Sequence, residues 1–111
     1  MVKKRSLFGD AVVHNNYVHL NINLNINRMP DYVVQDIEDL LAKAIQQSSI
    51  QADKQSWSEP DQYMATWGTE AWRGDIASIF AEGGNLKISA TFSGAEKFME
   101  EINKRYNIFP Y

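Results

Sequence analysis

The chain of 111 residues contains no cysteine, few prolines and glycines, and no apolar run that approaches a membrane span. The absence of cysteine excludes disulfides, thiolate nucleophiles and cysteine-based metal sites. A membrane-spanning helix needs about 20 consecutive apolar residues. The basic residues Lys3, Lys4 and Arg5 have no long apolar segment behind them, because Gly9 and Asp10 interrupt it after two apolar residues, so we expect no secretory signal and a cytoplasmic location.

The chain also lacks a surplus of positive charge, because its formal net charge is -3 and its pI is near 5.3. Nucleic-acid-binding domains usually carry a clustered basic surplus, so this balance argues against that class. A mildly acidic protein suits a partner with a basic surface. Hydrophobic residues make up 44% of the chain, which can fill one modest core, and we predict a single domain over residues 1–111.

The most distinctive segment is residues 17–27, YVHLNINLNIN, in which aliphatic residues alternate with Tyr17, His19 and four asparagines. Side chains alternate across a strand, so this pattern predicts one apolar face and one amide face. Asparagine is a poor strand former, so Asn21, Asn23 and Asn25 on an outward face call for a reason. They form either a solvated face or a recognition surface. A third possibility is strand addition at a sheet edge.

In the first half of the chain, a weak strand is expected over residues 7–13 and a turn over 14–17. The asparagine-rich strand would then form the second arm of a hairpin. Apolar residues at three- and four-residue steps predict an amphipathic helix over residues 30–47. Asp36, Glu38 and Asp39 on this helix are interpreted as a solvated acidic face.

In the second half, residues 48–57 show no strong period and are expected to be a linker or a short strand. Helix-start signals predict short helices over residues 59–67 and 69–80, the second of which would stop at two glycines. Strict alternation predicts a strand over residues 85–92, and helical periodicity predicts a last helix up to Tyr106.

The resulting order, β-β-α-(α)-α-β-α, predicts an α+β fold. We expect a small, mainly antiparallel sheet of about three strands with helices packed on one face. Because the strands alternate instead of being apolar throughout, the other face is expected to meet water or a partner.

Aromatic residues gather in the least regular part of the chain, where Trp57, Tyr63, Trp67 and Trp72 lie within 16 residues. Tryptophan and tyrosine dominate binding hot spots, which favours a contact surface. The alternative is that these side chains fill the core from a long connection. We expect at least one tryptophan to lie at the surface.

Catalytic and metal-binding patterns are not found. His14 and His19 are the only histidines, and their spacing supplies no convergent set of three or four ligands. The sequence contains neither a phosphate-binding loop nor a nucleophile-elbow motif. We therefore predict no catalytic residues, no metal, no cofactor and no enzyme activity.

The leading hypothesis is a non-enzymatic protein-binding domain that neutralises a macromolecular partner by occlusion. Inhibitors, immunity proteins and antitoxins of bacteria are analogous in size, charge and lack of cysteine. Two alternatives remain: a subunit or adaptor that self-associates through an edge strand or residues 108–111, and a single-stranded nucleic-acid binder that uses Lys3, Lys4 and Arg5. The candidate partner-binding residues are Tyr17, His19, Asn21, Asn23, Asn25, Trp57, Tyr63 and Trp67.

Overall fold

A computed structural model describes residues 9–14, 17–23, 28–69 and 75–106, with side chains from residue 17 onward. This part of the chain forms six strands and two helices. In chain order they are β1 (Gly9–His14), β2 (Tyr17–Asn23), α1 (Asp31–Gln47), β3 (Asp53–Glu59), β4 (Gln62–Gly68), β5 (Asp75–Glu82), β6 (Asn85–Thr91) and α2 (Ala95–Tyr106).

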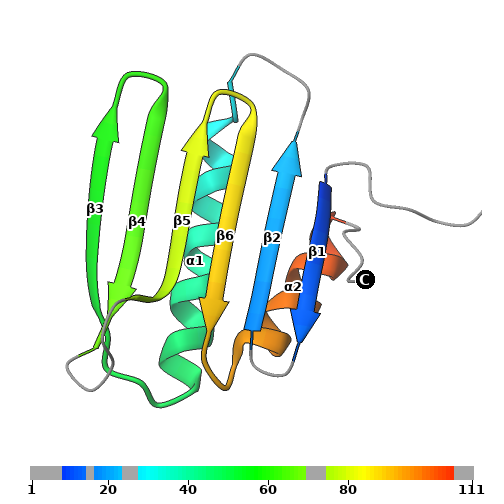
Figure 1. Cartoon of the computed structure of the whole chain (residues 1–111), viewed down its shortest axis with the longest axis vertical. Helices are drawn as coiled ribbons and strands as arrows, with labels where there is room; N and C mark the ends of the chain where they lie inside the picture. The colour runs from blue at the N-terminus through cyan, green and yellow to red at the C-terminus, as the bar shows by residue number, and fades with distance from the viewer. Residues whose placement is uncertain (1–8, 15–16, 24–27, 70–74, 107–111) are drawn as a thin grey trace, which may run out of the picture.

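The six strands form one antiparallel sheet in the order β1-β2-β6-β5-β4-β3 (Figure 1). The asparagine-rich β2 pairs with β1 on one side and with β6 on the other. It is therefore an interior strand, and strand addition to β2 is ruled out. The edges of the sheet are β1 and β3.

The predicted sheet of about three strands and the predicted element order are wrong. The segments expected to be helices over 59–67 and 69–80 contribute β4 and β5. Residues 48–57 were expected to be a linker or a short strand, and β3 confirms the strand alternative for their second half. Pro60-Asp61, which resembled a helix start, is a hairpin turn in which Asp61 has a φ of 66°. Proline followed by a positive φ matches a type II turn. The two glycines expected to stop a helix form the β5–β6 turn, with Gly83 at φ 59°.

The predictions for α1, α2, β2 and β6 are confirmed, because strong periodicity and burial agree there. The core side of β2 buries Val18, Leu20 and Ile22 completely. These residues face Ala90, Ile88 and Leu86 of β6 in register. The buried positions of the two helices cover this surface: Val33, Ile37, Leu41, Ala44 and Ile45 from α1, and Ala95, Phe98, Met99 and Ile102 from α2.

Both helices lie behind the sheet in Figure 1, with α1 behind β5 and β6 and α2 behind β1 and β2. They do not cover the whole of that face, since β3 is exposed along its entire length. The helices are tied together by Asp36 of α1, which accepts hydrogen bonds from Arg105 and from the Tyr106 hydroxyl of α2, the latter at 2.6 Å. The acidic helix face expected to be solvated therefore partly has a structural role.

Candidate functional site

The sheet face opposite the helices, which we call the open face, is organised in cross-strand rows. Residues directly opposite each other in an antiparallel pair project to the same face. The central row runs from Trp57 through Met64, Phe80 and Lys87 to Asn21. Five strands therefore place an aromatic and aliphatic cluster at one end of a row and an amide at the other, roughly 19 Å away at about 4.8 Å per strand.

The rows on either side are polar. Toward the Pro60-Asp61 turn lie Glu59, Gln62, Glu82, Asn85 and Asn23, and the Gln62 amide donates to Glu82 Oε2 at 2.6 Å. On the other side lie Gln55, Thr66, Ser78, Ser89 and His19. His19 Nδ1 and Ser89 Oγ are 3.0 Å apart. The apolar part of the central row is thus framed by hydrogen-bonding groups.

Five of the predicted partner-binding residues share this open face: Tyr17, His19, Asn21, Asn23 and Trp57. The sheet brings Asn21 and Trp57, which are 36 positions apart in the sequence, onto one surface. Trp57 is 51% exposed, Met64 37% and Tyr17 40%. The expectations that the β2 amides would not be buried and that one tryptophan would be at the surface are confirmed.

Tyr63 and Trp67 project to the helix-covered side instead. Trp67 is 4% exposed and belongs to the core, opposite Ala77 of β5. The ammonium of Lys54 lies 5.7 Å from the centre of the Trp67 ring, within range of a cation–π contact. The Tyr63 hydroxyl reaches Glu38 of α1, and neither aromatic contributes to the open face.

Tyr63 takes part in a buried polar cluster beneath α1. Glu38 of α1 is only 6% exposed, and its carboxylate accepts a hydrogen bond from the Tyr63 hydroxyl and one from Lys54 Nζ at 2.6 Å. Burial, followed by the neighbouring Glu38 carboxylate, raises the pKa of Tyr63 to about 12. The cluster fastens α1 to β3 and β4, and Glu38 was wrongly expected to be solvated.

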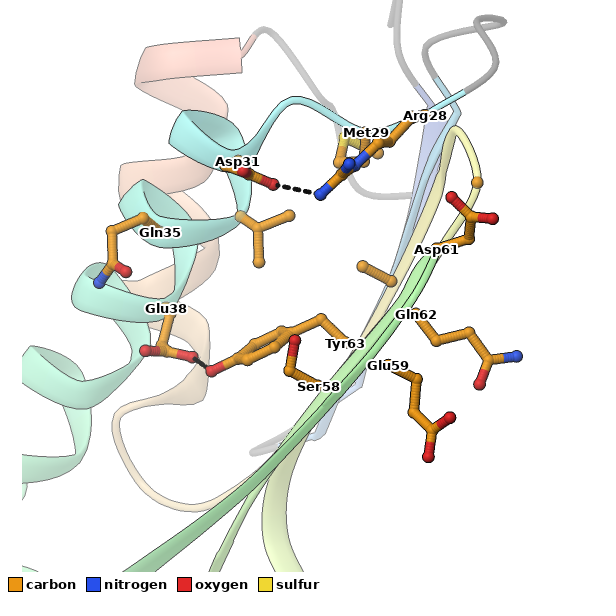
Figure 2. Close-up of a pocket in the computed structure, with 13 residues that line it drawn as sticks. Arg28, Met29, Asp31, Gln35, Glu38, Ser58, Glu59, Asp61, Gln62 and Tyr63 are labelled. Atoms are coloured by element: carbon orange, nitrogen blue, oxygen red, sulfur yellow. Dashed lines mark hydrogen bonds and ion pairs between the residues drawn. The ribbon is translucent and has the colours of Figure 1, made fainter.

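A cleft of about 290 Å³ opens between the start of α1 and the β3–β4 turn (Figure 2). Figure 2 shows Glu38, Tyr63 and Ser58 inside it, whereas Glu59 and Gln62 point away from the helix. Two of its four carboxylates are engaged, because Asp31 pairs with Arg28 at 3.3 Å and Glu38 holds Lys54 and Tyr63. The other two, Glu59 and Asp61, come from the β3–β4 hairpin.

Sequence reasoning missed Met64, Phe80 and Gln55 as open-face residues. The signal was present, since residues 62–67 alternate between Gln62, Met64, Thr66 on one side and Tyr63, Ala65, Trp67 on the other. Period-two alternation was outweighed by a turn that resembled a helix start. Several predicted positions lie outside the described residues: Asn25, Trp72, Lys3, Lys4, Arg5 and residues 108–111.

Within the described ranges, no group of three or more histidine or acidic side chains is placed to hold a metal ion. In the same ranges, neither helix has the length and apolar character that crossing a membrane requires. Comparison with known proteins gives no match to a family model, a curated protein or a solved structure.

Proposed function

We propose that this protein is a non-enzymatic protein-binding domain that engages its partner with the open face of the sheet. The observation that carries this proposal is the row of Trp57, Met64 and Phe80, which places three apolar side chains side by side on three strands. Trp57 and Met64 are exposed and Phe80 is half-buried. Tryptophan in such a setting is a typical binding hot spot, and polar groups around it supply the rim.

Charge favours a basic protein as the partner. The open face of the described strands β2 to β6 carries the carboxylates Asp53, Glu59, Asp75 and Glu82 against the single ammonium of Lys87. A negative surface of this kind speeds association with a positive one and repels nucleic acid. Occlusion of a basic surface is the mode of action that inhibitor-, immunity- or antitoxin-type proteins would use.

The area of the open face limits how much of the partner it can contact. Six strands at about 4.8 Å and seven residues at about 3.4 Å give the open face roughly 690 Å² in plan. A stable interface buries about 800 Å² on each side. The partner is therefore expected to extend beyond the flat face and around one edge of the sheet.

The test is capture by the immobilised full-length chain from an extract of its native source. Trp57→Ala should reduce retention of the partner at least tenfold, because a hot-spot truncation costs about 2 kcal/mol. Tyr32→Ala is the matched control, since Tyr32 is an exposed aromatic, 76% accessible, on the helix side of the molecule.

Retention by Tyr32→Ala should equal that of the wild type. The proposal is contradicted if Trp57→Ala retains the same proteins at the same level, or if the wild type retains nothing above a blank resin. Sizing of each variant, with the free energy of unfolding measured in urea, confirms that the comparison is made between folded proteins.

A further inference from the structure

The edge strand β3 has an outer side that no described strand covers. It is seven residues long, it is exposed at every position, and it pairs with β4 from Asp53 to Glu59 without a shift in register. Natural edge strands are usually protected by a bulge, a proline, short length or charged side chains, inward-pointing ones included. Of these devices, the described β3 has charged side chains alone, namely Asp53 and Glu59 at its ends and the inward-pointing Lys54.

That inward charge is already neutralised. Lys54 projects to the helix-covered side, where its ammonium lies 2.6 Å from the Glu38 carboxylate and above the ring of Trp67. A salt bridge to a carboxylate that is 8% exposed holds the lysine beneath the sheet and away from its edge. The positive charge of Lys54, which would otherwise repel an incoming basic chain, is therefore weakened.

The backbone of β3 offers alternating groups to an added strand. A two-residue turn makes Glu59 and Gln62 the first hydrogen-bonded pair of a hairpin, and such pairs recur at every second residue. By this rule the peptide groups of Glu59, Trp57 and Gln55 face β4. Those of Ser58, Ser56 and Lys54 then face outward and can pair with another chain.

The charged side chains of β3 determine which kind of chain can pair with this edge. On the open face, β3 presents Asp53 at one end and Glu59 at the other, with Gln55 and Trp57 between them. If a second copy paired through its own β3, antiparallel and with the two Ser56 residues opposite each other, Asp53 of each copy would lie opposite Glu59 of the other. Like charges directly opposite each other are destabilising, so the edge disfavours a second copy and favours a chain with basic residues at these positions.

We infer that the outer edge of β3 receives an extended basic segment of the partner protein as a seventh, antiparallel strand. Basic side chains of that segment lie opposite Asp53 and Glu59, and an apolar side chain lies against Trp57. The inference rests on the proposed function, because it names the edge over which the same partner extends. It also supplies the contact area that the flat face lacks.

The probe is the acetylated and amidated peptide Arg-Thr-Val-Thr-Val-Thr-Arg, titrated into the full chain to about 1 mM and followed by amide NMR and hydrogen exchange. In the antiparallel register its arginines meet Glu59 and Asp53. The amides of Lys54, Ser56 and Ser58 should gain protection, whereas those of Gln55 and Trp57 should change little. The same peptide with glutamate in place of both arginines should bind at least about tenfold more weakly.

Two variants make the test specific. Ser56→Pro removes one outward N–H at a position where an edge strand tolerates proline, and it should abolish peptide binding while Ser56→Ala does not. The paired substitution Asp53→Lys with Glu59→Lys should reverse the preference, so that the glutamate peptide binds more tightly. This reversal does not depend on the proline variant folding normally.

The inference is overturned if neither peptide binds, if both bind equally, or if protection shows no alternation along β3. It is also overturned if β3 becomes protected in the absence of peptide as the protein concentration rises, which would identify a second copy as the occupant. If the peptide test fails, the proposed function is still supported when Trp57→Ala loses the captured partner and Ser56→Pro retains it. If Trp57→Ala also retains the partner, the proposed function itself is contradicted.

Discussion

The hydroxyl of Tyr63 on β4 donates a hydrogen bond to the buried carboxylate of Glu38 on α1. Because Glu38 also holds Lys54 of β3, one carboxylate joins the helix to two strands of the hairpin. The hairpin carries Trp57 and the outer edge of the sheet, so the position of the proposed binding surface depends on this buried cluster.

Removal of the Tyr63 hydroxyl should weaken the protein measurably. We expect Tyr63→Phe to lower the free energy of unfolding by about 1–3 kcal/mol, because Glu38 loses a donor while it stays buried. Urea denaturation gives this value. With Glu38→Gln the effect of Tyr63→Phe should shrink, and equal effects in both backgrounds would mean that the two side chains do not interact.

Alkaline pH should destabilise the fold through the same tyrosine. Burial and then Glu38 raise the pKa of Tyr63 from 10.0 to about 12, so the folded state keeps a proton that the unfolded state has lost. Its contribution is fully present below pH 10 and is lost as the pH rises toward 12. Denaturation midpoints between pH 9 and 12 should therefore fall less steeply in Tyr63→Phe, and identical slopes would contradict the assignment.

Acid should loosen the contact between the helices. Burial would raise the pKa of Asp36, but hydrogen bonds from Tyr106 and Arg105, together with the Arg105 charge, lower it below 3.8. The folded state therefore binds the proton less readily, and this stabilisation is present above the unfolded pKa and lost as the pH falls through the folded one.

Asp36→Asn tests this contact. It should cost about 1 kcal/mol of unfolding free energy at pH 7, and the difference from the wild type should shrink toward pH 2. Asp39→Asn removes a carboxylate from the exposed side of the same helix, where it accepts only a local bond from Gln35, and should change stability by less than about 0.5 kcal/mol. Equal losses in the two variants would show that the Asp36 contact is unimportant.

Gly94, the residue before α2, lies against the end of α1. A methyl group at this position would lie 2.2 Å from Ser48 Oγ and 3.2 Å from the carbonyl oxygen of Ala44. Gly94→Ala should therefore lower the melting temperature, at a cost of about 1–3 kcal/mol. Ser48→Ala removes the nearest atom, so the double variant should recover part of that loss. A Gly94→Ala protein as stable as the wild type would contradict the packing.

Truncation of the two tryptophans of the β3–β4 hairpin should lower the free energy of unfolding by very different amounts. Trp67→Ala removes a side chain that is 4% exposed and should cost about 3–5 kcal/mol. Trp57→Ala removes one that is half exposed and should cost less than about 1 kcal/mol while it abolishes partner capture. Chemical denaturation of the two variants under one buffer condition makes the comparison. Similar stabilities would mean that the two rings are not on opposite sides of the sheet.

Local patterns predicted the elements whose packing and periodicity agree. The amphipathic spacing of α1 and α2 and the alternation of β2 and β6 were sufficient, because each buries one face in the core. The β3–β4 and β4–β5 pairings were missed, since β4 and β5 follow residues that also suit a helix start and the β3 segment shows no strong period. Pairing between β4 and β5 brings Met64 opposite Phe80. The helix or strand propensity of each residue does not predict such a contact between distant segments.

The sequence by itself determined the alternation of amides and aliphatic residues along β2, the two amphipathic helices and the modest negative charge, because these depend only on the order of side chains. Tertiary structure decided that Asn21 and Trp57 share one face, that Trp67 and Glu38 are buried, and that β3 rather than β2 ends the sheet. Strand order and register are set by which apolar faces fit beneath the helices together. That choice is made by long-range packing, which no local window of residues contains.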